Sequence, residues 1–242
     1  MTDTVQERVE RVQGAIAGAC ARAGRRVAEV GLVAVSKTHG PEAVQAAAAA
    51  GLTIFGESKV QEAAQKIPQC PGRIEWHMIG HLQTNKVRHA VTLFRMIHSV
   101  DSWKLLEAID RACGEDGARM PVCLEVNVSG ERSKFGIPPA EVPGVLEKSA
   151  GLGRVQVAGL MTMPPFDPET ENARPFFARL RELRDQWRAE TGFALEQLSM
   201  GMTQDFAVAI EEGATWVRIG SAIFGERPKR EKGAAGVGEE GE

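Results

Sequence analysis

The sequence contains no tyrosine among its 242 residues. It also lacks a membrane-spanning apolar run, a secretory signal and a strongly basic charge. Its apolar runs fall well short of the roughly 20 residues that a membrane-spanning helix needs, so we expect no membrane anchor. Residues 1–16, MTDTVQERVERVQGAI, lack the basic start and apolar core of a secretory signal, which predicts a cytoplasmic protein. The net charge of −3 and the pI of about 6.0 do not favour nucleic-acid binding.

Cysteines are few and unpaired in sequence. The four are Cys20, Cys70, Cys113 and Cys123, with no CxxC pair and no histidine at zinc-finger spacing. We therefore predict free thiols in a reducing compartment rather than a disulfide framework or a metal site.

Eight apolar runs rich in strand-forming residues alternate with segments of helical composition. The predicted strands are 31–37, 53–57, 75–80, 96–102, 122–129, 156–163, 197–203 and 216–225. The predicted helices are 41–50, 60–66, 83–90, 103–114, 140–150, 170–190 and 204–212, and an extra amphipathic helix at 4–23 precedes the first strand. This order predicts an α/β fold, a single (β/α)₈ TIM barrel over residues 1–226, with a doubly wound open sheet as the alternative. Residues 227–242, charged and rich in glycine, are predicted to be a disordered tail.

Active groups in such barrels lie at the carboxyl ends of the strands. Of the nine lysines, Lys37 alone ends an apolar strand, GLVAVSK. Partial desolvation there would lower its pKa and leave some neutral amine to attack an aldehyde. The alternative is a strand-end lysine that only reaches water.

Small polar residues gather at the ends of the last two predicted strands. Ser199, Gly201 and Thr203 lie in the end of the seventh, and Gly220 and Ser221 lie in the end of the eighth. Barrels often bind phosphate in the loops after these two strands, so we predict a phosphate site rather than plain turns.

Other candidates allow two interpretations each. Arg218 lies within the last strand, where an unpaired cation is costly, so it binds a polar ligand atom or pairs with an acid such as Glu57. His77 contacts a ligand ring or is a core histidine with its hydrogen bonds satisfied. Met161 is more typical of core packing than of ligand contact, and Lys134 is a weak loop candidate.

Seven motifs then occur in a recognisable order from Leu32 to Gly225. They read AVSKT, FGESKVQEA, WHMIGHLQTNK, HSVDS, VNVSGERSKFG, GLMTM and LSMGMTQDFAVAIEEGATWVRIGSAIFG. Together they resemble the pyridoxal phosphate homeostasis protein family, which is similar to the barrel domain of alanine racemases and belongs with the fold-type III pyridoxal phosphate (PLP) proteins. The resemblance implies PLP as cofactor and a role in its supply.

The resemblance also assigns individual residues. Lys37 matches the lysine that forms a Schiff base with PLP, and Arg218 matches the arginine that faces the pyridine nitrogen. The positions matching phosphate contacts are Ser199, Gly220 and Ser221, and those in motifs that line the cofactor are His77, Met161 and Met202. Ser58, in FGES, replaces an asparagine usual in the family and is expected to weaken any contact there.

Three function classes follow: a PLP-binding protein without turnover, an amino-acid racemase, and a Schiff-base aldolase without cofactor. Racemisation needs a base on each face of the α-carbon, and alanine racemases supply a tyrosine for one of them. This chain has none, and we expect no additional β-domain after Gly225. The resemblance therefore favours a monomeric carrier that is not an enzyme, with apo PLP-dependent enzymes as recipients of the cofactor.

Overall fold

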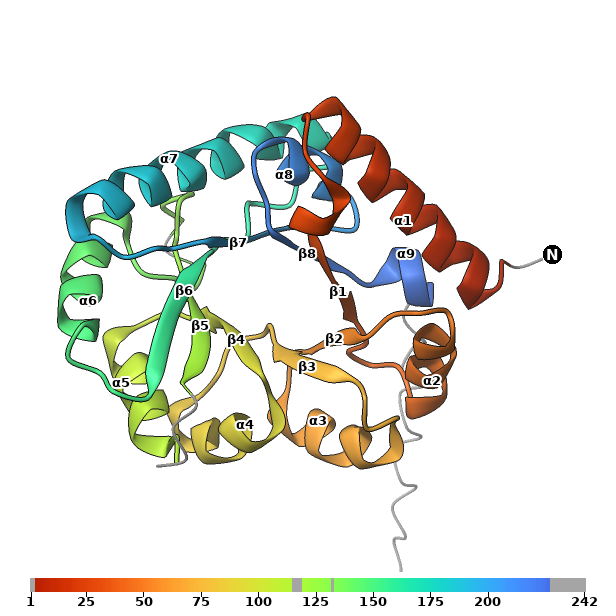
Figure 1. The fold of residues 1–242 in the computed structure, drawn as a ribbon, viewed down its shortest axis with the longest axis horizontal. Helices are drawn as coiled ribbons and strands as arrows, with labels where there is room; N and C mark the ends of the chain where they lie inside the picture. The colour runs from red at the N-terminus through yellow and green to blue at the C-terminus, as the bar shows by residue number, and fades with distance from the viewer. Residues whose placement is uncertain (1–2, 115–118, 132, 227–242) are drawn as a thin grey trace, which may run out of the picture.

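Eight parallel strands form a closed barrel in a computed structural model that describes residues 3–114, 119–131 and 133–226. Each strand pairs with its neighbours in chain order, and β8 pairs with β1 to close the ring (Figure 1). The strands are β1 Gly31–Val35, β2 Ile54–Glu57, β3 Glu75–Met78, β4 Met96–Val100, β5 Met120–Glu125, β6 Val155–Met161, β7 Gln197–Met202 and β8 Trp216–Ile219. The predicted barrel is thereby confirmed, and the open sheet is wrong.

Helices surround the barrel and cover its outer face (Figure 1). They are α1 Val5–Arg22, α2 Pro41–Ala49, α3 Val60–Lys66, α4 Val87–Leu93, α5 Trp103–Ala112, α6 Val142–Ser149, α7 Arg174–Thr191, α8 Phe206–Glu211 and α9 Ser221–Phe224. Short 3₁₀ turns lie at η1 Val27–Glu29, η2 Ile67–Gln69, η3 Thr84–Lys86, η4 Pro139–Glu141 and η5 Thr170–Ala173. The N-terminal helix α1 packs along α8 and α9.

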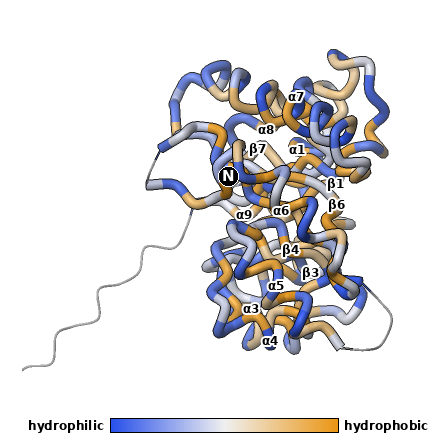
Figure 2. The backbone as a smooth tube through the Cα atoms, turned by 90° about the vertical axis from the view of Figure 1, so that its left-hand side faces the viewer, coloured by the Kyte–Doolittle hydropathy of each residue, from blue (hydrophilic) through white to orange (hydrophobic). Residues whose placement is uncertain are grey.

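Side chains alternate between the two faces of each strand. Val33 and Val35 of β1 pack with Ile79 inside the barrel, whereas Ala34 packs with the helices outside. Both faces are apolar because both are covered, which is typical of a parallel sheet. In Figure 2 the central strands are coloured mainly for hydrophobic residues, and hydrophilic segments gather toward the outside.

Local signals explain where the longest helices begin and end. Thr4 and Glu7 form a capping box at the start of α1, with each side chain bonded to the other residue's backbone amide. Helix α7 buries Phe177, Leu180, Leu183 and Trp187 on one face. It ends at Gly192, whose φ of 72° is the left-handed conformation that glycine adopts most easily.

The predicted elements agree with the observed ones in type and order, but several bounds differ. The helix predicted at 83–90 is a 3₁₀ turn followed by α4 at Val87–Leu93, and the strand predicted at 122–129 is β5 at Met120–Glu125. The predicted last strand, 216–225, ends at Ile219, and residues Ser221–Phe224 form the short helix α9 instead. The helix predicted from residue 204 begins at Phe206. The predicted tail at 227–242 lies outside the described residues.

Two expectations about composition also meet the structure. Within the described ranges, no helix has the length and apolarity needed to cross a bilayer. All four cysteines lie in these ranges and are free thiols, as predicted.

Gly159, at the tightest approach between β6 and β7, gives a test of the packing. A Cβ atom there would lie 1.9 Å from the carbonyl oxygen of Gln197, which is backbone and cannot rotate away. We expect Gly159→Ala to lower the free energy of unfolding by about 1–3 kcal/mol or more, measured by urea denaturation. Gly14→Ala, on the exposed face of α1 with nothing within 4 Å, is the control and should stabilise by about 0.5–1 kcal/mol. Equal stability of Gly159→Ala and wild type would contradict this account.

Candidate functional site

A cavity of about 340 Å³ opens at the carboxyl end of the barrel, where small-molecule sites of roughly 300–1,000 Å³ are usual. Its lining comes from five chain segments that closure of the barrel brings together. They are Val35, Lys37 and His39 at and after the end of β1; Ile79 after β3; Met163, Pro165, Phe166, Asp167, Thr170 and Ala173 after β6; Met202, Thr203, Gln204 and Asp205 at and after the end of β7; and Arg218, Gly220, Ser221 and Gly225 in and after β8.

Lys37 enters this cavity from the turn after β1. It is half-buried and continues the alternation of Val33 and Val35, which face the barrel interior. Ser36, between Val35 and Lys37 in the sequence, is fully buried on the helix-facing side of the barrel wall. The next residue, Thr38, has a φ of 69°, an unusual conformation for a β-branched residue.

Groups that follow the last two strands line the same cavity as Lys37. Gly220 lies so close to β1 that a Cβ atom would be 3.3 Å from the carbonyl oxygen of Val35. Its amide donates to Thr203 Oγ1 at 3.2 Å. Ser221 begins α9, where the first backbone amides of a helix have no intrahelical acceptor. The Gly220 amide is engaged by Thr203, which leaves the Ser221 amide and the hydroxyl groups of Thr203 and Ser221 as hydrogen-bond donors suited to an anion.

Arg218 points into the barrel beneath the cavity and is only 4% exposed. Nη1 donates to Ser199 Oγ at 2.6 Å, and Nη2 donates to the Thr162 carbonyl oxygen at 3.1 Å. Burial lowers its pKa, and the charges of Glu125 and Asp205 oppose that shift.

The alternative that Arg218 pairs with Glu57 is wrong. The carboxylate of Glu57 lies on the helix-facing side of β2 and binds Lys66 Nζ at 2.6 Å.

A chain of buried polar groups continues from Arg218 through the barrel interior. Ser199 Oγ lies 2.7 Å from His98 Nδ1, and His98 Nε2 lies 2.9 Å from His77 Nδ1. His77 Nε2 lies 3.0 Å from Glu75 Oε1. We call this chain the interior relay.

The two ends of the interior relay determine its direction. An arginine can only donate hydrogen bonds, and an ionised carboxylate can only accept them. Every donor is therefore satisfied when Ser199 donates to His98, His98 to His77 and His77 to Glu75. In this arrangement both histidines are neutral and carry their proton on Nε2. Burial is the largest cause that holds the pKa of His98 well below its usual value, with His77 and Arg218 adding to it.

Two further buried groups surround Arg218. Burial, reinforced by the nearby Asp101, raises the pKa of Glu125 at the end of β5 to about 7. Burial raises the pKa of the Cys123 thiol to about 12, so this thiol is protonated at neutral pH. Among the described residues, no group of three or more histidines, cysteines or acids is arranged to hold a metal ion.

The chain is similar in sequence to proteins of a known family. The family model for the alanine racemase N-terminal domain matches residues 13–228. The pyridoxal phosphate homeostasis protein of Aquifex aeolicus is 44% identical over 222 residues, which cover 91% of this chain and 97% of that protein. The protein of the same name from Pseudomonas aeruginosa is 42% identical, covering 93% and 96%.

The chain belongs to the pyridoxal phosphate homeostasis protein family. A solved member of similar structure is PipY of Synechococcus elongatus PCC7942, determined with PLP bound. It is 37% identical, has a TM-score of 0.80, and the match covers 91% of this chain and all of that one.

The cavity of this family member brings together five of the nine predicted site residues. They are Lys37, Met202, Arg218, Gly220 and Ser221. Met161 instead packs beside Cys123 and Met96 inside the barrel and is fully buried. Ser58 follows β2, half-buried, and is not among the residues that line the cavity.

Two predicted contacts need correction. Ser199 was predicted to bind phosphate, but it is fully buried and its hydroxyl is bonded to Arg218 and His98. His77 was predicted to line the cofactor, but it is 1% exposed and belongs to the interior relay. The alternative interpretation of His77, a core histidine with satisfied hydrogen bonds, describes it correctly.

Sequence reasoning assigned one residue of the site only in part and missed another. Thr203 belonged to the predicted phosphate cluster but not to the residues assigned by resemblance; it lines the cavity, and its hydroxyl oxygen accepts the Gly220 amide. His98 was overlooked, and the available signal was its position two residues after Met96, which packs inside the barrel beside Cys123 and Met161. Lys134 and Asn127 line a separate cavity of about 190 Å³.

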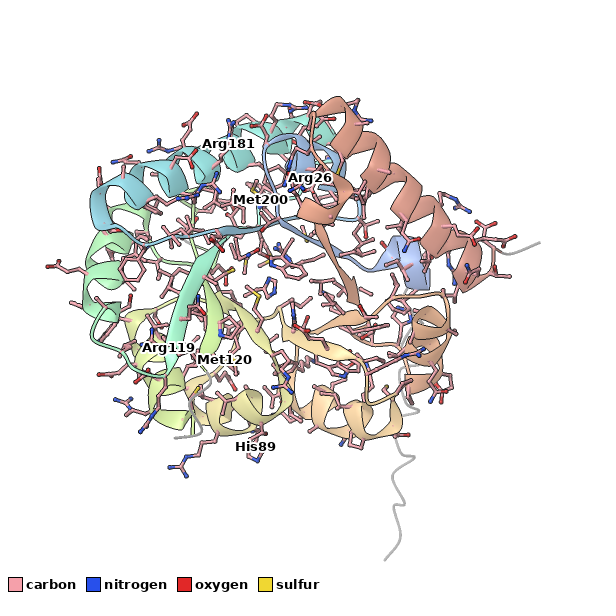
Figure 3. The ribbon with its side chains drawn as sticks, in the orientation of Figure 1. Arg26, His89, Arg119, Met120, Arg181 and Met200 are labelled. Carbon is pink, nitrogen blue, oxygen red and sulfur yellow. The ribbon has the colours of Figure 1, made fainter. Side chains whose placement is uncertain are left out.

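His98 should make stability depend on pH in a defined way. Its pKa is depressed in the folded state, so below about pH 6.5 only the unfolded chain takes up its proton, and stability falls as the pH is lowered. We expect the stability advantage of wild type over His98→Gln to shrink by about 1.4 kcal/mol per pH unit below that point, measured by urea unfolding between pH 7.5 and 5. His89→Gln, on the outward face of α4 (Figure 3), is the control. A constant difference across this range would contradict the neutral relay.

Proposed function

We propose that this chain binds PLP in the cavity as a Schiff base on Lys37 and holds the cofactor for supply to other proteins. The observation that carries the proposal is that one cavity contains Lys37, the buried Arg218 and the donors of Thr203 and Ser221. A lysine amine, a ring-facing donor and an anion site are the three contacts that an aldehyde-bearing pyridine phosphate requires. The PLP bound to PipY supports the same ligand.

The phosphate is proposed to bind at Thr203, Gly220 and Ser221. The tight turn that presents Thr203 is closed by two bonds, from the Met202 amide to Asp205 Oδ1 at 2.6 Å and from the Asp205 amide to the Met202 carbonyl at 3.1 Å. Gly201, with a φ of 93°, precedes it, and a Cβ there would lie 2.5 Å from Ala209 Cβ. A rigid donor set binds an anion with little ordering cost.

Arg218 is proposed to face the pyridine nitrogen of the cofactor. PLP promotes reactions at the α-carbon of bound amino acids by drawing electrons into its ring, most strongly when that nitrogen is protonated. A guanidinium has only donors, so a nitrogen bonded to Arg218 must accept and stays unprotonated. Two acceptors support this because they hold the guanidinium in place: Ser199 of the interior relay and the Thr162 carbonyl oxygen.

An amino-acid racemase is the second candidate function. His39 lines the same cavity as Lys37 and stacks on Phe224 with ring centroids 5.2 Å apart, so it could supply a second base. The carrier is favoured because the sequence has no tyrosine and because Arg218 weakens the electron sink.

Transfer to apo PLP-dependent enzymes is part of the proposal. Phe166 is 78% exposed, Met163 38% and Met202 37%, and all three line the mouth of the cavity. Exposed apolar groups at a ligand entrance are typical of interaction sites. We place this monomeric carrier in the cytoplasm, where its free thiols would persist.

Borohydride reduction tests the covalent site. In the presence of PLP we expect the trapped mass mainly on the peptide that contains Lys37, because among the lysines that the structure describes only Lys37 lines the cavity. Lys37→Ala should keep the far-UV circular dichroism spectrum and lose the trapped mass, and Lys134→Ala serves as the matched control. A trapped mass mainly on Lys134 or Lys59 would overturn the assignment.

Turnover is tested in deuterated water. The protein loaded with PLP and incubated with L-alanine should show an absorbance change from amine exchange but no deuterium at the α-carbon beyond that produced by free PLP. The physical reason is the unprotonated ring nitrogen beside Arg218. Deuterium incorporation by wild type that Lys37→Ala abolishes would favour the racemase instead.

A further inference from the structure

Lys66 lies outside the cavity, in the layer between the barrel and α3, and is only 5% exposed. Its ammonium group has three donors and three partners. These are the Ser36 carbonyl oxygen at 2.9 Å, Glu57 Oε1 at 2.6 Å and Glu62 Oε1 at 3.0 Å. The hydrogen-bonding capacity of Lys66 is therefore saturated, and one of its bonds reaches the residue next to Lys37.

The same two carboxylates hold both neighbours of Lys37. Glu57 Oε1 accepts the hydroxyl of Ser36 at 2.7 Å, and Glu62 Oε1 accepts the backbone amide of Thr38 at 2.6 Å. Residues 36 and 38 are thus each bound to an oxygen that Lys66 also binds. We call Lys66, Glu57 and Glu62 the turn clamp.

The turn needs such a clamp because its backbone is strained. Thr38 has a φ of 69°, which crowds its branched side chain, and such conformations persist only where the surroundings over-determine them. Released from the clamp, the turn would relax toward ordinary values of φ. Relaxation at residue 38 would redirect the side chain of the residue before it.

We propose that Lys66 is the positioning residue for Lys37: through Glu57, Glu62 and the Ser36 carbonyl it fixes the turn that presents the Lys37 amine to the cavity. The inference rests on the proposed function of Lys37 and adds the group that orients it. Lys66 acts from outside the barrel, because Glu57 and Ser36 are on the helix-facing side of their strands.

Stability alone is a poor explanation of the clamp. Two carboxylates surround one buried ammonium behind β1 and β2, and Glu57 Oε2 is buried without a hydrogen-bond partner. Burying such a group is costly, and apolar side chains of the same shape often stabilise a fold at least as well. The cluster instead fixes the backbone geometry of the turn around Lys37, which apolar packing cannot specify.

The test measures the reactivity of Lys37 with and without the cofactor. In the apo protein, acetic anhydride labelling followed by peptide mass spectrometry gives the reactivity of Lys37 relative to the other lysines. With PLP added, the visible absorbance gives the rate of capture. The variants are Lys66→Met, Glu62→Leu, which removes the acceptor for Thr38, and Glu62→Gln, which retains an oxygen there. Lys104→Met, exposed on α5, is the control.

We expect Lys66→Met and Glu62→Leu to slow capture roughly tenfold to a hundredfold and to change the relative labelling of Lys37 in folded protein. Glu62→Gln and Lys104→Met should stay close to wild type. The inference would be overturned if folded Lys66→Met captured PLP and was labelled at Lys37 as wild type is. If Lys66→Met does not fold, the same result in Glu62→Leu would overturn it. Failure of wild type itself to trap PLP on Lys37 would refute the proposed function instead, and the labelling ratios would still decide the role of the clamp.

Discussion

The pairing of β1 with β8 is the constraint on which the site depends. Four residue pairs from Gly31↔Trp216 to Ala34↔Ile219 close the barrel, and the Gly31 amide donates to the Thr215 carbonyl at 2.7 Å. The partners are almost the whole chain apart in sequence, so closure is among the most non-local contacts that folding must make. Closure of the barrel places Lys37, which follows the first strand, beside Gly220, which follows the last strand. In an open sheet these two residues would lie at opposite edges.

A second constraint follows from putting a guanidinium inside a barrel. Arg218 can only donate hydrogen bonds, so the interior must supply acceptors to it. Ser199 and the Thr162 carbonyl do so, and the Ser199 proton then needs an acceptor of its own. The interior relay meets this requirement and ends on Glu75, which is half-exposed. The hydrogen bond from His77 lowers the pKa of Glu75. The polar interior is therefore a consequence of one cation, and neutral histidines keep further positive charge away from it.

Strand order and the lysine could be predicted because both depend on local patterns: apolar runs, helix signals and the position of Lys37 at a strand end. The roles within LSMGMT could not. The register of β7 against β8 runs from Ser199↔Trp216 to Met202↔Arg218. Over this stretch β7 advances by three residues while β8 advances by two. This bulge shifts the alternation of side chains, and it leaves Ser199 beneath the cavity and Thr203 within it. Ser221 was assigned to the last strand instead of to α9, because no local apolar pattern separates the end of β8 from the first turn of α9.

The two halves of the site are held by networks that have no member in common. The turn clamp holds Lys37 from outside β1 and β2, and the interior relay holds Arg218 from inside the barrel. Groups without shared partners contribute nearly independently to binding. In the proposed carrier, a covalent contact at Lys37 could therefore break and re-form while Arg218 and the groups at Thr203 and Ser221 keep their geometry. Such a separation suits the proposed transfer of the cofactor to an incoming amine. An enzyme that breaks bonds at the α-carbon would instead need the amine held against the substrate throughout turnover, with a second base beside it.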